Sequence, residues 1–215
     1  MNRQWQLAQW AEIRWWKRYL KNREPHAYLD WKMAYWHSFL AASGLELSAG
    51  ARVLDAGCGP AGIFTTLPAC RVDALDPLIP GYANLPHFRP ENYPWTRFLP
   101  QTLESFSGEE QYDMAFCLNA LNHMRDISRC VEILHRALKP GGHLLVSVDV
   151  HKWQAMKWLF RMAPFDVLHP FQEGPSGYER LFTEAGFVVK SERRHQKGLL
   201  FDYRVWNLQK QTYTS

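Results

Sequence analysis

A carboxylate followed by three glycines is the most chemically informative segment of the sequence. Asp55 precedes Gly57, Gly59 and Gly62, and the apolar pair Val53-Leu54 comes directly before it. Glycines at this spacing, between a strand and a helix, let the backbone approach a ligand where any Cβ would collide. The same spacing is found in dinucleotide-binding sites, where the start of the helix binds a diphosphate. The glycines alone therefore predict a bound ligand without identifying it.

The charge of Asp55 distinguishes between the two kinds of ligand. A dinucleotide fingerprint normally has an apolar residue two places before its first glycine, and a carboxylate there favours a cationic ligand over a diphosphate. S-adenosylmethionine carries a sulfonium and an α-ammonium and has no phosphate, so it suits this position. Asp76 follows a second apolar segment, nineteen residues after Gly57, where a carboxylate can accept hydrogen bonds from both ribose hydroxyls. Asp76 indicates nucleotide binding without choosing the nucleotide.

The elements that must position these residues follow from the hydrophobic pattern. We predict strands at residues 53–54, 71–75, 95–99, 112–118 and 143–150, and helices at 61–67, 127–138 and 178–185. The apolar segments 187–189 and 199–206 are predicted to form a terminal hairpin around Gln196-Lys197-Gly198. Strands alternating with helices indicate an α/β fold, with a mostly parallel sheet and an antiparallel strand at its end.

Two helices are expected before this pattern begins. The first places on one side Trp5, Ala8, Glu12, Trp15, Trp16, Tyr19 and Leu20, with Arg3, Arg14, Lys17 and Arg18 opposite. After Glu24-Pro25 the second is expected to bury Tyr28, Trp31, Tyr35, Phe39 and Leu40 and to stop at Gly44. We therefore predict an N-terminal helical cap at residues 1–46, followed at 47–215 by the α/β domain.

Four motifs in order resemble the class I S-adenosylmethionine-dependent methyltransferase family, in the small-molecule type grouped as methyltransferase domains 11 and 25. They are Val53-Leu54-Asp55-Ala56-Gly57-Cys58-Gly59, Ala74-Leu75-Asp76-Pro77, Gln111-Tyr112-Asp113-Met114-Ala115-Phe116 with Leu121-Asn122-His123, and Leu138-Lys139-Pro140-Gly141-Gly142-His143-Leu144-Leu145. The resemblance runs from about Arg52 to the C-terminus. It implies a Rossmann-like, seven-stranded, mostly parallel sheet whose last strand is antiparallel, and methyl transfer from S-adenosylmethionine with S-adenosylhomocysteine as product.

The resemblance also implies roles for particular residues. Asp55, Gly57 and Gly59 are expected at the methionine end of the cofactor, and Asp76 at the ribose. Cys58 and Pro77, within the same two motifs, are expected contacts as well. Leu103 and Glu104 resemble the adenine contacts, although the acidic residue often found one step earlier is Thr102 here, and Asn119 would face the methionine part.

Methyl transfer from a sulfonium needs mainly alignment and exclusion of water, so a catalytic base is optional. His123 follows the fourth predicted strand and His151 the fifth, so both are candidate bases for a hydroxyl acceptor. A structural role in the loop is the competing interpretation for His123, while His151 shares a strand face with Asp149. A lid-like insertion at about 151–177, rich in aromatic residues, is expected to help select a small-molecule acceptor.

The composition of the chain limits the classes of protein to which it could belong. The chain is 47% apolar and 21% charged with a net charge of +4, which is ordinary for a globular protein. Neither a membrane-spanning run nor a signal peptide is recognisable, and the four cysteines form no zinc-type spacing, so we expect a cytoplasmic protein without a metal site. Cys117 lies in an apolar run, where a buried strand residue is expected rather than a nucleophile.

Three alternatives stay open at this stage. The motif Leu118-Asn119-Ala120-Leu121-Asn122-His123 lacks the Pro-Pro-aromatic pattern of base-methylating enzymes, which argues against a nucleic-acid substrate. The aromatic and basic first helix would also suit a membrane surface, although a buried cap helix is the preferred interpretation. A non-catalytic S-adenosylmethionine-binding protein, or an NAD-dependent oxidoreductase on a similar scaffold, is the third alternative. The oligomeric state is not predicted.

Overall fold

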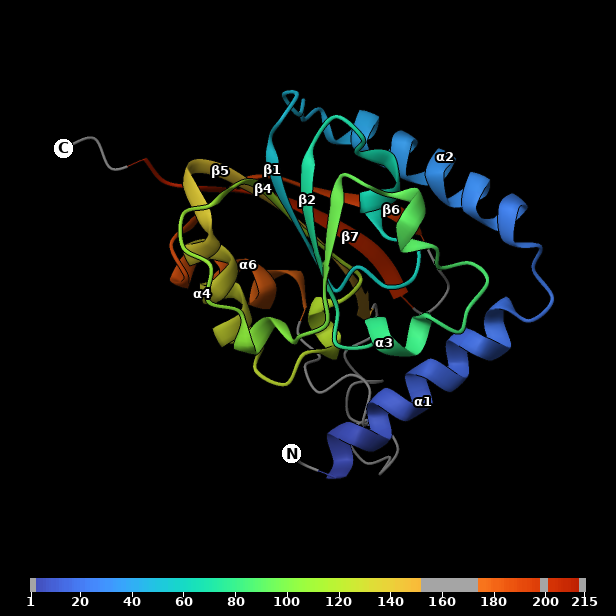
Figure 1. Ribbon diagram of the computed structural model, residues 1–215. Helices are drawn as coiled ribbons and strands as arrows, with labels where there is room; N and C mark the ends of the chain where they lie inside the picture. Colours follow the sequence, from blue (N-terminus) through green and yellow to red (C-terminus); the bar gives the residue numbers. More distant parts are fainter. Residues whose placement is uncertain (1–2, 152–173, 198–200, 213–215) are drawn as a thin grey trace. The chain divides into compact units, whose positions relative to one another are not determined.

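The computed structural model describes residues 3–151, 174–197 and 201–212. The chain divides into two compact units, Met1–Thr102 and Leu103–Ser215, and each is described by itself (Figure 1). Most of the predicted lid, and the tip of the predicted hairpin, lie outside the described residues.

Three parallel strands form the sheet of the first unit. They are β1 (Arg52–Ala56), β2 (Arg71–Leu75) and β3 (Thr96–Leu99), in the order β3-β2-β1. Four of the five side chains of β1 and of β2 are buried, as expected for parallel strands covered on both faces. Asp55 pairs with Ala74 in this register. The glycine-rich turn after β1 and Asp76 after β2 therefore lie at the same, carboxyl edge of the sheet.

Two helices, α1 (Arg3–Leu20) and α2 (Pro25–Ser43), precede β1 as predicted. The Glu24 carboxylate caps α2 by accepting hydrogen bonds from the backbone N–H groups of His26 and Ala27, and Gly44 ends the helix at φ 67°. The prediction that α2 buries Trp31 and Leu40 was wrong for Trp31, which is 53% exposed, and Leu40 is only partly buried. In α1, Trp15 is also 53% exposed.

The helical repeat explains these two exposed tryptophans. In α1 the inner side carries Ile13, Trp16 and Leu20, and Trp15 lies about a quarter turn away, where its ring stacks on Tyr19 at 4.9 Å. In α2 the buried residues are Tyr28, Trp36 and Phe39, which moves the buried face away from Trp31.

The segments that join the strands of the first unit are short. The predicted helix at 61–67 is wrong, because only a 3-10 turn, η1 (Ile63–Thr66), forms there. Thr65 and Thr66 direct their hydroxyls to the carbonyls of Gly62 and Ile63 at 2.8 and 2.9 Å, and Pro68 follows, so the helix does not continue. After β2 come the single turn α3 (Ile79–Tyr82) and the 3-10 turn η2 (Pro90–Asn92).

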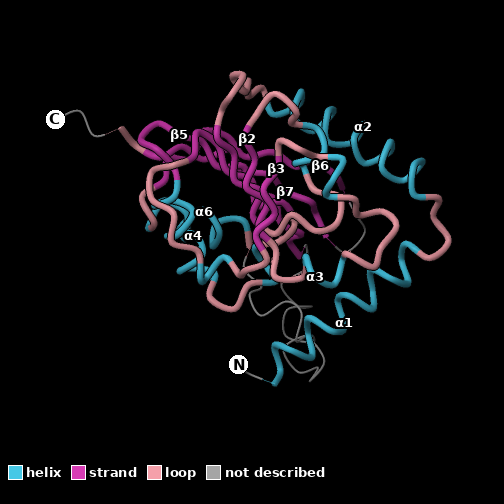
Figure 2. The backbone as a smooth tube through the Cα atoms, viewed as in Figure 1, coloured by secondary structure: helices cyan, strands magenta, loops and turns pink. Residues whose placement is uncertain are grey.

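The described residues of the second unit form the other four strands and two longer helices. Its strands are β4 (Tyr112–Leu118), β5 (Leu138–His151), β6 (Phe187–Lys197) and β7 (Phe201–Lys210), in the order β4-β5-β7-β6. β4 and β5 are parallel, and β7 runs antiparallel to both β5 and β6. The helices α4 (Ile127–Ala137) and α6 (Pro175–Glu184), both labelled in Figure 2, contact each other. Two 3-10 turns are described in this unit, η3 (Leu103–Ser105) and η4 (Leu121–His123).

The strand order of the chain, β3-β2-β1-β4-β5-β7-β6, is that of one seven-stranded sheet with a single antiparallel strand. The predicted Rossmann-like α/β class, with its helical N-terminal extension, is confirmed. Strands at 71–75 and 112–118 were predicted with their observed bounds, whereas the hairpin strands and β5 are longer than predicted. The hairpin extends because polar side chains continue along β6 on its exposed side.

Two further expectations concern cysteines and membrane spans. Cys58, Cys70, Cys117 and Cys130 are free and buried, and Cys117 is a fully buried residue of β4, as predicted. Within the described ranges, no helix combines the length and the apolar character that crossing a membrane requires.

Candidate functional site

Asp55 is a buried carboxylate at the end of a buried strand. Only 2% of the residue is exposed, and its Oδ2 accepts a hydrogen bond from the Phe64 N–H at 3.2 Å. The pKa of Asp55 is raised to about 7, because burial and, to a lesser degree, the charge of nearby Asp76 outweigh the Phe64 hydrogen bond and Lys32, which lower it. The protein thus holds a carboxyl group that ionises near neutral pH beside the glycine-rich turn.

The glycine-rich turn has backbone geometry that only glycine adopts readily. Gly57 and Gly59 have φ values of 75° and 59°, in the left-handed region. The N–H groups of Gly57 and Cys58 both donate to the Leu75 carbonyl, at 2.7 and 3.2 Å, which ties the turn to the end of β2. At Gly62 a Cβ would collide with the Cys58 carbonyl oxygen and lie 2.6 Å from Asp55 Oδ2. The backbone of the turn at Gly62 therefore packs directly against the Asp55 carboxylate.

Asp76 connects the two motifs of the first unit. Its Oδ2 accepts hydrogen bonds from the Gly59 N–H at 3.0 Å and the Tyr82 hydroxyl at 3.4 Å, and its Oδ1 accepts one from the Leu78 N–H at 2.8 Å. Burial raises the pKa of Asp76 despite these three donors. Pro77, the other predicted contact in this motif, is partly buried.

The helix α1 lies against this turn. A Cβ built on Gly59 would lie 3.7 Å from Trp16 Cζ2, and one built on Gly81 would lie 2.5 Å from Ile13 Cδ1. The Trp16 ring also makes an edge-on contact with Tyr82, at a centroid distance of 6.4 Å. The Trp16 side chain hydrogen-bonds the Glu12 carboxylate, and burial, with Asp76 nearby, raises the pKa of Glu12 to about 7. A third carboxyl group therefore joins Asp55 and Asp76.

Lys32 of α2 is the cation whose charge acts on this group. Its Nζ lies over the Trp36 ring, 4.3 Å from the centroid, and Trp36 Nε1 donates to the Ala61 carbonyl in the glycine-rich turn at 3.0 Å. Burial lowers the pKa of Lys32 to about 8, and Asp55 opposes that shift. Sequence reasoning missed both Glu12 and Lys32. The available signal was a charged residue on the otherwise aromatic side of each helix.

Asn119 lies directly after β4 in the second unit. It is an exposed, non-glycine residue with a φ of 53°, which is uncommon and favours asparagine. Its N–H donates to the Ser147 carbonyl and hydroxyl oxygens at 3.0 and 2.9 Å, and that hydroxyl is 2.6 Å from the Tyr203 hydroxyl. Strands β5 and β7 thus fix the backbone of Asn119 and leave its side chain exposed.

The predicted adenine contacts lie at the start of the second unit. Leu103 is buried, and Glu104 accepts hydrogen bonds from the Arg125 N–H at 3.0 Å and from the Cys130 thiol. Asn122 is only 4% exposed, and its Oδ1 has no hydrogen-bond partner within the part of the chain that the structure describes. A buried carbonyl oxygen without a partner is costly and suits a position that contacts a ligand.

Of the two candidate bases, the structure describes the side chain of His123 but not that of His151. His123 is an exposed residue of η4 whose N–H donates to the Ala120 carbonyl at 3.0 Å. His151 is the last residue of β5 and pairs with Phe201 of β7, and its side chain lies outside the described structure. Among the described residues no group of three or more potential ligands is placed to hold a metal ion.

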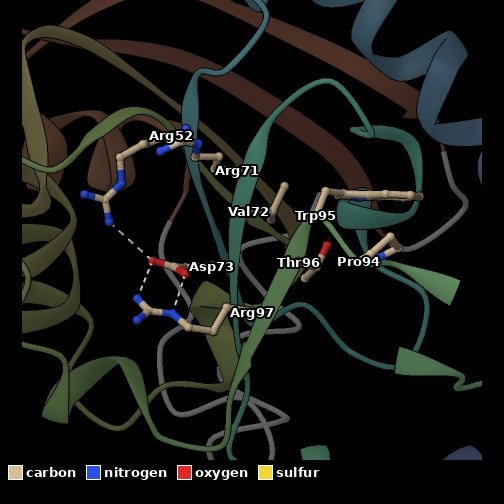
Figure 3. A pocket seen from close by; sticks show the side chains of 8 residues that line it. All are labelled: Arg52, Arg71, Val72, Asp73, Pro94, Trp95, Thr96 and Arg97. Carbon is tan, nitrogen blue, oxygen red and sulfur yellow. Dashed lines mark hydrogen bonds and ion pairs between the residues drawn. The ribbon is translucent and has the colours of Figure 1, made fainter. Parts of the chain in front are cut away.

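A cavity of about 350 Å³ lies elsewhere in the first unit (Figure 3). Its wall includes the first residues of β1, β2 and β3, which places it at the amino ends of the strands. Arg97 binds Asp73 there with two hydrogen bonds of 2.8 Å, and Arg52 lies 3.8 Å from the same carboxylate. Guanidinium groups do not suit a cationic ligand. This cavity is therefore distinct from the site at the carboxyl ends of β1 and β2, where Asp55 and Asp76 lie.

A family described as a methyltransferase domain matches residues 15–192 of the chain. The chain belongs to the class I S-adenosylmethionine-dependent methyltransferase family. Its relatives in this family include the ubiquinone biosynthesis O-methyltransferase of Rickettsia canadensis, 25% identical over 70% of this chain and 66% of the relative. That of Pseudomonas syringae pv. tomato is 34% identical over 46% and 44%. The chain thus spans from about a third to just under two thirds of the curated relatives it matches.

Solved structures of the methyltransferase family share the fold of the chain. The Burkholderia thailandensis 1,6-didemethyltoxoflavin-N1-methyltransferase, with its namesake substrate and S-adenosylhomocysteine bound, has a TM-score of 0.62 at 20% identity, over 94% of this chain and 89% of that one. The phosphoethanolamine N-methyltransferase 2 of Haemonchus contortus has a TM-score of 0.68 at 13% identity, over 83% and 53%. The [4+2]-cyclase SpnF has a TM-score of 0.65 at 16% identity, over 81% and 79%. The fold thus also occurs in a protein named for another reaction.

The residues in and around the glycine-rich turn fit S-adenosylmethionine. The close approach at Gly62 and the left-handed Gly57 and Gly59 create a turn whose glycine positions add no side chains of their own. The charge balance agrees, because within the described part of the chain Lys32 is the one cation whose charge acts on this group, and it acts on Asp55, while the carboxyl groups number three, at Glu12, Asp55 and Asp76. A sulfonium and an ammonium would compensate that excess of negative charge.

Proposed function

We propose that the protein is an S-adenosylmethionine-dependent methyltransferase that acts on a small molecule. The observation that carries this proposal is the buried Asp55 carboxyl group, closed into the glycine-rich turn of a chain from this family. S-adenosylmethionine supplies an electrophilic methyl group on a sulfonium. Asp55, Gly57, Cys58 and Gly59 bind its methionine end, Asp76 and Pro77 its ribose, Leu103 and Glu104 its adenine, and Asn119 its methionine part.

The residues of the chain contribute alignment and charge to this reaction. Buried carboxylates stabilise a cationic ligand more strongly than exposed ones, because the surroundings screen them less. In-line displacement at a methyl group then depends on holding the acceptor atom in position and on excluding water. Where the acceptor is a hydroxyl, His123 or His151 removes its proton.

The relatives and the sequence support a small-molecule acceptor. One relative is named for ubiquinone biosynthesis, and one solved structure is named for the small molecule 1,6-didemethyltoxoflavin. The motif after β4 also argues against a nucleic-acid acceptor. We place the protein in the cytoplasm, with residues 1–46 as a helical cap, residues 47–215 as the methyltransferase domain and residues 151–177 as its lid.

A labelled-cofactor assay tests this function directly. Purified protein is incubated with S-adenosylmethionine carrying a labelled methyl group and a panel of phenols, amines and heterocycles, and transfer to at least one acceptor is expected. His123→Ala and His151→Ala then test the base, because unchanged turnover in both would leave alignment as the mechanism. Thermal stabilisation by NAD, with none by S-adenosylhomocysteine, would refute the proposal.

A second candidate, association with a membrane surface, has one observation in its favour. Trp10, Trp15 and Trp31 are all more than half exposed, and Arg14 and Lys17 are exposed on the same helix as the first two. Tryptophan beside basic residues is typical of helices that lie in a membrane interface. Flotation with anionic vesicles tests this candidate, and failure to float with them would exclude it.

A further inference from the structure

The hydrogen bonds of Asp76 leave little capacity for a ligand. An ionised carboxylate has about four positions at which it can accept a hydrogen bond, two on each oxygen. Among the described residues three are taken, by the N–H of Gly59, the hydroxyl of Tyr82 and the N–H of Leu78. With respect to these residues, both positions of Oδ2 are filled and one on Oδ1 remains. Asp76 can therefore accept one ribose hydroxyl without giving up a bond that holds the turn.

A ribose presents two adjacent hydroxyl groups, so a second acceptor is required nearby. Glu12 of α1 meets this requirement. Its carboxyl group is close enough to Asp76 for the two charges to interact, and the Trp16 side chain, which covers Gly59, donates a hydrogen bond to it. The contact of Ile13 with Gly81 and that of Trp16 with Tyr82 hold α1 in this place.

We propose that Glu12 is the second ribose acceptor of the cofactor site and that its carboxylate binds the hydroxyl for which Asp76 has no position left. Trp16 orients this carboxylate through its hydrogen bond. The inference rests on the proposed function, because it assumes an adenosyl ligand. It makes α1 part of the cofactor site and assigns a site residue outside the four sequence motifs.

The binding of one ribose hydroxyl by each of the two carboxyl groups also changes their protonation. Glu12 and Asp76 repel each other when both are ionised, so the free protein retains protons on this group near neutral pH. Hydroxyl donors and a cationic ligand favour the ionised forms. Binding of the cofactor is then accompanied by proton release, part of which comes from Glu12.

The test is calorimetric binding of S-adenosylhomocysteine and of its 2′-deoxy and 3′-deoxy analogues to the full chain. Glu12→Leu is expected to weaken binding of S-adenosylhomocysteine about tenfold or more. The analogue that lacks the hydroxyl bound by Glu12 should bind the wild type more weakly by a similar factor, and its affinity for Glu12→Leu should equal that of S-adenosylhomocysteine. The analogue that lacks the hydroxyl bound by Asp76 should bind both proteins more weakly, by the same factor. Glu12→Gln should lower the number of protons released near pH 7, measured in two buffers of different ionisation enthalpy.

Matched variants separate this role from a structural one. Trp16→Phe, which removes the indole donor, should weaken binding several-fold, whereas Trp15→Phe on the exposed side of α1 should leave it unchanged. Wild-type affinity in Glu12→Leu, or equal losses for both deoxy analogues in wild type and variant, would overturn the inference and leave the proposed function intact. Absence of binding by the wild type itself would overturn the proposed function and the inference with it.

Discussion

At the scale of single residues, the protonation state of Asp55 that stabilises the fold differs from the one that binds a cationic ligand. Its pKa is raised to about 7 by burial, so the protonated form stabilises the fold. This contribution is fully present below the unfolded pKa near 3.9 and is lost as the pH rises through about 7, up to a limit of about 4 kcal/mol. A cationic ligand, by contrast, needs the ionised form.

Asp55→Asn should therefore lose cofactor affinity and not stability. Because an amide does not ionise, the free energy of unfolding of the variant should decline less between pH 5 and pH 8 than that of the wild type, and the variant should be the more stable protein at pH 8. Urea unfolding over this pH range measures the first effect, and binding of S-adenosylhomocysteine the second.

Asp73→Asn provides the control, because it makes the same chemical change at the amino ends of the strands. It removes a carboxylate that binds Arg97, so it should alter stability and leave binding of S-adenosylhomocysteine unchanged. A parallel decline of Asp55→Asn and the wild type with pH would contradict the assignment of a raised pKa to Asp55.

Single residues of the site differ in whether the sequence alone can predict them. Asp55 and Asp76 were predicted because each follows its strand within a short motif, so local spacing suffices to place them. Glu12 and Lys32 were not, because their proximity to Asp76 and Asp55 depends on how α1 and α2 pack on the turn. No local pattern encodes that packing.

At the scale of elements, the end of β4 shows how a strand positions an exposed side chain. Asn119 has a positive φ, and its N–H is held by Ser147. Asn119→Gly should keep the stability of the wild type, because glycine adopts this conformation freely. Asn119→Ala should cost about 1 kcal/mol, because alanine has neither the freedom of glycine nor the local hydrogen bonding of asparagine.

Comparison of the two variants separates the backbone of Asn119 from its side chain. If the side chain faces the cofactor, both variants should bind S-adenosylhomocysteine more weakly, although only Asn119→Ala is less stable. Chemical unfolding and calorimetry on the same samples measure the two effects. Wild-type affinity in Asn119→Gly would restrict Asn119 to a role in the loop.

Elements also differ in how well the sequence predicts them. β2 and β4 were predicted with correct bounds because their apolar runs end abruptly at polar or turn residues. The helix expected at 61–67 did not form, since two threonine hydroxyls bind backbone carbonyls there. The hydrophobic pattern does not register that competition between side chain and backbone.

At the scale of the whole molecule, the carboxyl groups make free and bound states respond oppositely to pH. The pKa values of Glu12 and Asp55 are both raised to about 7, and that of Asp76 is raised as well. Raising the pH from 6 to 8 ionises Glu12 and Asp55, which destabilises the free protein and strengthens its affinity for a cation by about tenfold for each of these two groups.

The thermal shift produced by the cofactor should therefore grow with pH. At about a hundred times its dissociation constant, a ligand stabilises a protein by about 2.7 kcal/mol, which for a chain of this size corresponds to a rise in Tm of roughly 5–10 °C. With a fixed concentration of S-adenosylmethionine, the rise should be larger at pH 8 than at pH 6, while the Tm of the free protein falls. Arg71→Gln, at the amino ends of the strands, should show the same trend, and Asp55→Asn a weaker one. A shift that is independent of pH in the wild type would mean that these carboxyl groups do not face the ligand.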